Sequence, residues 1–194
     1  MTPEQHLRHF AEFYVAVELS GGATPHMQMT VEAARREADD LEKLWWLGCY
    51  VMGYNFALAE ILAMRWRPGE WADAELEAWL TEHWKGIPLH RYRKTVNSPR
   101  KLTSSLRSYA TYITETLPQR EWYAERWWPT GKGPGELWAE AFDDIKGSVH
   151  RIGRYMSLRW TEGVRRTFDM AMVAPDIRAE GGTSPRTALS LFYP

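Results

Sequence analysis

The segment VAPDIRAEGGTSPR, residues 173–186, gathers several residue types that can do chemistry. A carboxylate in a proline-bounded loop can accept a proton, and arginine binds phosphate through two parallel hydrogen bonds. Adjacent glycines let the backbone approach a phosphate closely, because they have no Cβ. The candidates in this segment are Asp176, Arg178, Gly181, Gly182, Ser184 and Arg186. Two alternatives stay open: Asp176 only turns the chain after Pro175, and Arg178 only forms a surface ion pair with it.

A second candidate site is the sequence DDIKGSVHRIGRYMSLRW, residues 143–160. Its pattern predicts a helix that ends near Lys146, a tight glycine-containing hairpin and a new helix that opens at Ile152. A helix that begins after a glycine presents free backbone N–H groups, which bind anions. The residues that could meet a phosphate there are Arg154, Tyr155 and Arg159.

The net charge of the chain is −1, but the cations are concentrated in two segments. Residues 83–114 contain no Asp or Glu, and residues 146–166 contain Glu162 as their one acid. If both segments lie on one face, they form a phosphate-binding surface; the alternative is two unrelated solvated faces. The first segment provides Arg91, Lys94, Arg100 and Lys101 as candidates for DNA binding and Arg107 as a candidate for phosphate binding.

Aromatic residues are interleaved with these basic segments: Trp84, Tyr92, Tyr109, Tyr155 and Trp160. Aromatic rings beside arginines suit stacking on nucleic-acid bases. The alternative for each ring is a place in the hydrophobic core.

Helical periodicity runs through most of the chain, and few stretches alternate as strands do. Ser98 and Ser184 each precede a proline, the arrangement of an N-cap followed by proline at the first helical position. We expect helices over 3–21, 30–66 (an acidic one, then an apolar one), 71–86, 98–117, 133–147 and 153–168, and a last one from Ser184. The sequence therefore predicts one all-α domain over 1–194, with N-terminal helices in 1–66, a basic helical section in 71–117 and the hairpin and C-terminal loop in 133–194.

The composition of 194 residues, with 44% hydrophobic residues and 11 Trp, is typical of a folded globular domain. The single cysteine, Cys49, lies in an apolar run and is expected in the core. No histidine spacing indicates a metal site, and neither a P-loop nor a dinucleotide fingerprint is present, so no cofactor is expected. Glycines and polar residues interrupt the apolar stretch 44–64, and the N-terminus has no apolar signal segment. We expect a soluble cytoplasmic protein without a membrane partner.

The segment 143–166 resembles the hairpin segment of the helix–hairpin–helix DNA glycosylases, which are all-α proteins. In that family a Gly-rich hairpin precedes an active-site Asp, and here Asp176 follows Gly153 by 23 residues. The hairpin reads VHRIGR instead of the usual Gly-x-Gly pattern, and one cysteine cannot hold the family's four-cysteine iron–sulfur cluster.

A resemblance over most of the chain is to the phage amino acid:DNA transferases, also called the α-glutamyl/putrescinyl thymine pyrophosphorylases. It rests on GRYMSLRW, on PDIRAEGGTSPRTALSLFYP and on SPRKLTSSLRSYATYI. The resemblance implies a glycosylase-like helical fold that acts on double-stranded DNA carrying a pyrophosphorylated 5-hydroxymethyluracil. An amino acid or polyamine would displace the pyrophosphate, in the cytoplasm of an infected bacterium.

For that reaction, arginines would hold the pyrophosphate, and a carboxylate would accept or orient the proton of the amine. The target base would leave the duplex stack. The candidate arginines are Arg107, Arg154, Arg159, Arg178 and Arg186, and the carboxylate is Asp176, with Glu60 as a second candidate. Two other functions stay open: a glycosylase-like enzyme that cleaves the N-glycosidic bond, and a non-catalytic DNA-binding protein. The identity of the amine is also open.

Overall fold

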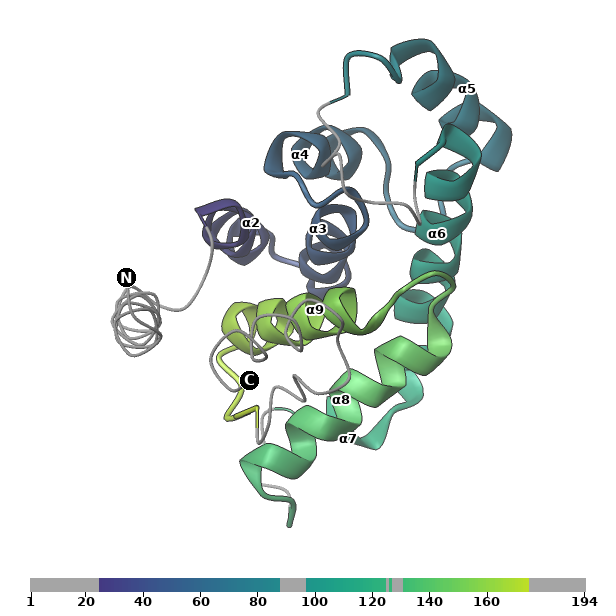
Figure 1. Ribbon diagram of the computed structural model, residues 1–194. Coiled ribbons are helices and arrows are strands. Elements are labelled where there is room, and N and C mark those ends of the chain that lie inside the picture. Colours follow the sequence, from purple (N-terminus) through teal and green to yellow (C-terminus); the bar gives the residue numbers. More distant parts are fainter. Residues whose placement is uncertain (1–24, 88–96, 125, 127–130, 175–194) are drawn as a thin grey trace, which may run out of the picture.

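The computed structural model describes residues 25–87, 97–124, 126 and 131–174, and the secondary structure of these residues is entirely helical (Figure 1). The expected all-α class is confirmed, whereas the likeness to the glycosylase fold stays a prediction. The elements are α2 (Pro25–Arg36), α3 (Asp40–Gly53), α4 (Phe56–Arg65), α5 (Asp73–His83), α6 (Pro99–Thr111), a π-helix (Tyr112–Thr116), a 3-10 turn (Leu117–Gln119), α7 (Glu121–Ala124), α8 (Pro134–Ser148) and α9 (Arg154–Thr167).

Capping side chains decide where several helices begin. Asp39 accepts a hydrogen bond from the N–H of Leu41 at the start of α3, and Asn55 accepts one from Leu58 at the start of α4. Where two helices were expected over 30–66, the structure has three, and the first begins at Pro25. The reason is that Asp39 caps the start of α3, while left-handed Tyr54 ends α3 and Asn55 caps the start of α4.

The Ser-Pro signal at the start of α6 is confirmed, because Ser98 accepts a hydrogen bond from the N–H of Lys101. The end of that helix differs from the expectation. The continuous helix predicted to residue 117 becomes a π-helix after Thr111 and then a 3-10 turn at Leu117.

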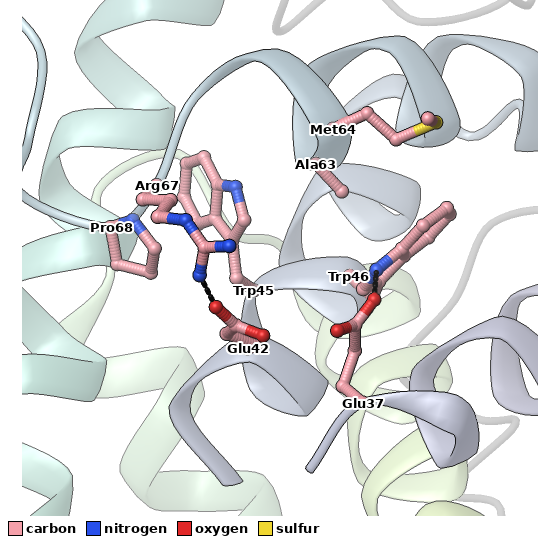
Figure 2. A pocket seen from close by; sticks show the side chains of 8 residues that line it. All are labelled: Glu37, Glu42, Trp45, Trp46, Ala63, Met64, Arg67 and Pro68. Carbon is pink, nitrogen blue, oxygen red and sulfur yellow. Dashed lines mark hydrogen bonds and ion pairs between the residues drawn. The ribbon is translucent and has the colours of Figure 1, made fainter. Parts of the chain in front are cut away.

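Helix α3 is the centre of the described structure, with α2, α4, α6 and α9 around it (Figure 1). Every residue from Leu44 to Gly53 is buried, including Cys49, as expected for a helix that is apolar on all sides. On one side, α3 and α4 border a cavity of about 210 Å³, which is lined by Trp45 and Trp46 of α3 and by Ala63 and Met64 of α4 (Figure 2).

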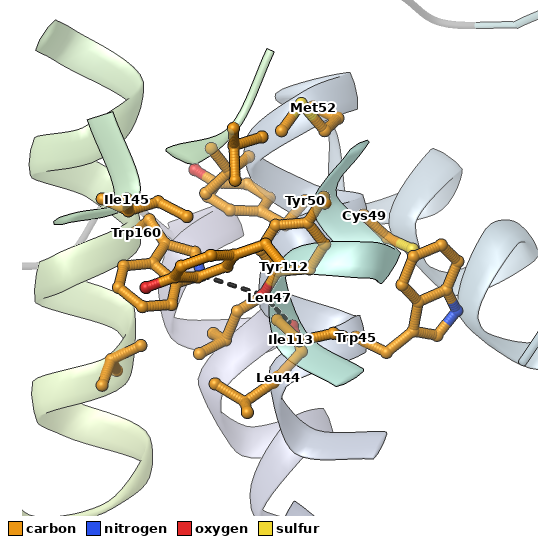
Figure 3. Close-up of a cluster of buried hydrophobic side chains, with 14 of the residues drawn as sticks. Leu44, Trp45, Leu47, Cys49, Tyr50, Met52, Tyr112, Ile113, Ile145 and Trp160 are labelled. Atoms are coloured by element: carbon orange, nitrogen blue, oxygen red, sulfur yellow. Dashed lines mark hydrogen bonds between the residues drawn. The ribbon is translucent and has the colours of Figure 1, made fainter. Parts of the chain in front are cut away.

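The phenol of Tyr109 joins three helices in the core. Tyr109 comes from α6 and is fully buried, and its hydroxyl donates to the carbonyl of Leu44 in α3 at 2.6 Å. The same hydroxyl accepts a hydrogen bond from the indole Nε1 of Trp160 in α9 at 2.8 Å (Figure 3). Its ring lies directly on α3 at Gly48, where a Cβ would stand 1.8 Å from the ring atom Cε1. Helices α3 and α6 can therefore approach this closely only because residue 48 is glycine.

The carboxylate of Asp144 in α8 is a second buried polar contact, which holds α8 against the segment that follows α6. The carboxylate of Asp144 accepts hydrogen bonds from Tyr112 at 3.0 Å, from the indole of Trp122 at 3.2 Å and from Ser148 at 3.2 Å. Arg120 forms an ion pair with it at 3.0 Å. These four partners satisfy the hydrogen-bonding capacity of a mostly buried carboxylate, so we assign Asp144 a structural role.

The predicted break between two helices is present between Ser148 and Arg154. The turn passes through Arg151, which adopts a left-handed conformation with φ 63°. The backbone N–H of His150 donates to the hydroxyl of Ser108 at 2.8 Å, so the hairpin is fixed to α6.

We predict that Gly48→Ala destabilises the fold although alanine favours a helix by about 1 kcal/mol. The added methyl group would overlap the ring of Tyr109, and overpacking of this kind costs about 1–3 kcal/mol or more. Urea unfolding followed by circular dichroism measures the change in the free energy of unfolding.

Gly147→Ala is the matched control, because Gly147 is also helical and a Cβ there meets no described atom within 4 Å. The control variant should be neutral or more stable by up to about 1 kcal/mol. Equal stability of the two variants would contradict the close contact between α3 and Tyr109.

Candidate phosphate-binding site at the start of α9

Two tyrosines and an arginine meet where α9 begins. Tyr155 lies in the first turn of α9, and its hydroxyl is hydrogen-bonded to the hydroxyl of Tyr54 at the end of α3. Arg159, one turn later, donates from Nε to the hydroxyl of Tyr155 at 3.1 Å and covers its ring, with 5.2 Å between Cζ and the ring centroid. Tyr155 is 51% exposed, so the group, which we call the phenol cluster (Tyr54, Tyr155 and Arg159), opens to solvent.

Tyr54 has an unusual backbone conformation for its side chain. Its φ of 53° and ψ of 31° lie in the left-handed region, which a bulky aromatic residue rarely adopts. The ring is held in place by Tyr50, with centroids 5.6 Å apart, and by Tyr155, also at 5.6 Å. Backbone strain of this kind is concentrated at functional sites.

The pKa values of two members of the phenol cluster, Tyr54 and Arg159, are raised. Burial raises the pKa of Tyr54 well above that of a free phenol, and its hydrogen bond to Tyr155 raises it further. Burial opposes the charge of Arg159, but the phenols of Tyr155 and Tyr54 outweigh it, so the pKa of Arg159 is raised. The cluster therefore combines the phenol of Tyr54, which stays neutral near pH 7, with the cation of Arg159.

The donors of this cluster suit an oxyanion. Among the residues that the structure describes, no group accepts a hydrogen bond from the terminal amino groups of Arg159. The N-cap of α9 is Gly153, which has no side chain to cap the helix, and a Cβ there would meet no described atom within 4 Å. An uncapped helix N-terminus favours an anion, and a neighbouring guanidinium adds charge and direction.

The structure thus brings together three of the predicted site residues, Arg154, Tyr155 and Arg159, on the first turns of one helix. Tyr54 was missed by the sequence analysis. The triplet Gly53-Tyr54-Asn55 between two apolar runs is a signal for a helix end with a left-handed residue. It could have predicted the turn between α3 and α4. The contact between Tyr54 and Tyr155, which lie 101 residues apart, cannot be predicted from the sequence around either residue.

Arg107 does not join this site in the structure. It lies on α6, where Nε donates to Asp73 at 2.7 Å and Nη2 donates to the carbonyl of Trp71 at 2.6 Å. Its guanidinium also lies 4.7 Å from the ring centroid of Trp71. These contacts tie α6 to the start of α5, so the predicted phosphate contact of Arg107 stays a prediction that competes with them.

The DNA-binding candidates Arg100 and Lys101 lie in the first turn of α6. Lys101 donates to the side chain of Asn97 at 2.8 Å, and Arg100 is exposed. Ser108, where α6 meets the hairpin, is about 12 Å further along the helix axis than Arg100. The hairpin therefore contacts α6 at the end opposite to Arg100 and Lys101, next to Arg107.

The basic character of residues 146–166 is partly neutralised by Glu162. Arg165 donates to both of its oxygens, at 3.0 and 2.7 Å, and Arg166 donates at 2.5 Å. Burial alone would raise the pKa of Glu162, but the two guanidinium groups lower it on balance. The other cations of this segment that lie near the hairpin are Lys146, Arg151, Arg154 and Arg159.

The aromatic candidates divide between core and surface. Tyr109 and Trp160 are buried, Trp84 is partly buried against the core, and Tyr155 is exposed. The remaining candidates lie outside the described residues: Tyr92, Arg91, Lys94, Asp176, Arg178, Gly181, Gly182, Ser184 and Arg186. The last described segment returns to α8, because Val173 donates to the carbonyl of Pro134 at 3.1 Å.

Within the described ranges, no group of three His, Cys, Asp or Glu side chains could hold a metal ion. None of the described helices is long and apolar enough to cross a membrane. The chain matches no protein-family model, no curated protein and no solved structure.

We predict that Tyr155→Phe lowers the pKa of Tyr54 toward that of a free phenol, without reaching it. The variant removes the hydrogen bond and the neighbouring ionisable group, while burial still disfavours the phenolate. Titration of ¹³Cζ-labelled tyrosine by NMR, with Tyr54→Phe for assignment, measures the change.

Tyr112 serves as the internal control, because burial and Asp144 raise its pKa independently of Tyr155. The sign for stability follows from the same shift. Since the pKa of Tyr54 is higher folded than unfolded, its contribution to stability is complete below pH about 10 and is lost as the pH rises further. An unchanged pKa of Tyr54 in Tyr155→Phe would show that the two phenols are not coupled.

Proposed function

We propose that this chain is an amine:DNA transferase that displaces pyrophosphate from a modified thymine base. The observation that supports it is the phenol cluster at the uncapped start of α9, where two phenol hydroxyls, a guanidinium and a helix N-terminus lie together. The resemblance of the sequence to the phage amino acid:DNA transferases supplies the substrate, a pyrophosphorylated 5-hydroxymethyluracil in double-stranded DNA.

In the proposed reaction, the neutral amine attacks the exocyclic methylene carbon of the base. A carbon–nitrogen bond forms, the bond from that carbon to the pyrophosphate oxygen breaks, and the oxygen keeps the electron pair. The amine loses one proton in the same process. No oxidant or reductant is required.

The phenol cluster would act on the leaving group. The two terminal amino groups of Arg159 would bind the pyrophosphate oxygens, and the first turn of α9 would add its backbone donors. The hydroxyl of Tyr155 would donate to the same group, and the hydroxyl of Tyr54, whose pKa is raised by burial, would donate to Tyr155. Donors arranged before the reaction stabilise charge that develops in the transition state.

The remaining parts of the reaction need a hold on the base and a proton acceptor. The exposed ring of Tyr155 is suited to stacking on a base that has left the duplex. Asp176, outside the described residues, is the proposed proton acceptor, and Arg178 and Arg186 are proposed as further phosphate ligands. Arg100 and Lys101 on α6 are proposed to contact the DNA backbone.

A glycosylase-like enzyme is the second candidate, and the hairpin favours it. The turn 149–153 leads into an uncapped helix and is fixed to α6 through Ser108, an arrangement that suits a DNA backbone phosphate. Such an enzyme would remove the base instead of modifying it.

One assay separates these functions. The protein is incubated with DNA that carries the pyrophosphorylated base and with a set of amines, and the digested nucleosides are analysed by mass spectrometry. Amine adducts together with free pyrophosphate support the transferase. Abasic sites would support the glycosylase, and unchanged nucleosides despite DNA binding would leave a non-catalytic role.

We predict that Arg159→Gln lowers the rate of transfer about a hundredfold, the usual cost of removing one donor to a developing oxyanion. Arg159→Lys should recover part of the loss, because lysine keeps the charge but not the planar pair of donors. The initial rate of pyrophosphate release at saturating DNA measures the effect.

Arg165→Gln is the matched control on the same helix, since Arg165 is paired with Glu162. Its rate should stay within about twofold of the unmodified protein, as is usual for a surface change away from a functional site. A normal rate for Arg159→Gln, or an equal loss in both variants, would remove Arg159 from the phosphate site.

A further inference from the structure

A groove near the turn between α3 and α4 combines aromatic, apolar and acidic side chains. It has a volume of about 360 Å³ and lies between α2 and α4, over Trp46 of α3. The smaller cavity of about 210 Å³ beside it shares Glu37, Trp46 and Met64 with the groove (Figure 2), so the two form one continuous depression. We call the larger part, of about 360 Å³, the acidic groove.

The floor of the acidic groove is aromatic and its rim is apolar. The rings of Trp46 and Phe56 are stacked with their centroids 6.2 Å apart and an interplanar angle of 22°. Two methionines stand at the rim, Met29 with 46% and Met64 with 77% of the residue exposed. Exposed methionines beside aromatic rings form an adaptable surface for an aliphatic chain.

Three carboxylates line the groove, and none of them forms an ion pair with a described residue. Glu37 accepts a hydrogen bond from the indole of Trp46 at 2.9 Å through one oxygen, and its other oxygen has no partner among the described residues. Glu32 accepts only from the neutral amide of Gln28, at 3.1 Å, and Glu60 has no partner in the described part of the chain. Arg36 lines the same groove but pairs with none of these three carboxylates.

The carboxylate of Glu42, in the neighbouring cavity, does have a basic partner. Glu42, in the smaller cavity, forms an ion pair with Arg67 (Figure 2). The negative charge that is left without a partner is therefore in the groove between α2 and α4. Among the described residues that line the groove there are three carboxylates and one cation, Arg36, which gives this lining an excess of negative charge.

A metal ion does not fit this arrangement. Two of the carboxylates lie on α2 and α4 and Glu37 directly follows α2, and no three of the described acidic or histidine side chains are close enough to hold a metal. Carboxylates beside a stacked aromatic floor suit an elongated cation, in which an aliphatic chain covers the rings and ammonium groups meet the carboxylates. The volume lies at the lower end of small-molecule pockets, so the groove accommodates a small molecule.

We infer that the acidic groove binds a linear aliphatic polyamine without a carboxylate group. The groove lies close to the phenol cluster, since Phe56 of the groove and Tyr54 of the cluster are two residues apart, at most about 7 Å along the chain. As a binding site, the groove does not depend on the proposed reaction. Its role as the holder of the amine co-substrate rests on the proposed function, and it favours a polyamine over an amino acid.

The test is isothermal titration of the full chain with spermidine at low ionic strength. Glu60→Gln and Glu32→Gln should each weaken the spermidine Kd about fivefold, which corresponds to about 1 kcal/mol. Both residues are exposed and lie away from the core, so these variants keep the fold. The indole N–H signal of Trp46, assigned with Trp46→Phe, should shift on titration.

Glu82→Gln is the matched control, because Glu82 is an exposed helical glutamate of α5 outside the groove. An equal loss in this variant would mean that spermidine binds by general charge, which overturns the site. Unchanged binding in Glu60→Gln and Glu32→Gln overturns it as well.

Two further ligands test the chemical class. Free glutamate should bind at least about tenfold more weakly than spermidine, because its carboxylates would meet the glutamates of the groove. A short lysine peptide that binds more tightly than spermidine would reveal a protein partner and overturn the small-molecule assignment.

The two proposals fail separately. Binding that depends on Glu60 and Glu32 without any transfer would retain the groove and reject the transferase. Transfer with a KM for the amine that Glu60→Gln does not change would retain the transferase and reject the groove as its amine site.

Discussion

The contact of Tyr109 with the backbone of α3 at Gly48 sets the geometry of the described structure. One buried hydroxyl satisfies the carbonyl of Leu44 and the indole of Trp160, so α3, α6 and α9 are fixed to one another by a single side chain. A buried polar group of this kind is favourable only when its partners are all in place. The same contact therefore selects both the distance between α3 and α6 and the rotation of α9.

This constraint explains why the phenol cluster exists. Helices α3 and α9 run antiparallel, since Lys43 lies over Phe168, Leu47 meets α9 at Gly163, and Tyr54 meets Tyr155. The end of α3 is thereby brought to the start of α9, where an uncapped helix and Arg159 attract anions. The corner at residues 54–56 separates this positive site from the acidic groove, and the two sites have opposite charge on adjoining surfaces.

Local signals predicted much of the fold. Ser98 marked the start of α6, the glycines before Arg154 marked the hairpin, and the apolar run at 44–53 marked the central helix. The arrangement of distant residues had no such signal, because it depends on packing. Asp73 binds Arg107 across 34 residues, and the acidic groove combines three helices. The pairing of Glu162 with Arg165 and Arg166 could have been predicted from their spacing of three and four residues on a helix.

The central claim is that the start of α9, with Tyr54, is where a phosphorylated substrate binds. The most direct measurement is a crystal structure of the chain with a short DNA duplex that carries the pyrophosphorylated base. We expect the pyrophosphate within hydrogen-bond distance of Arg159 and Tyr155, with backbone N–H groups of the first turn of α9 pointing at it. A pyrophosphate bound elsewhere, with the Tyr54–Tyr155 hydrogen bond intact and solvent in front of α9, would contradict the account.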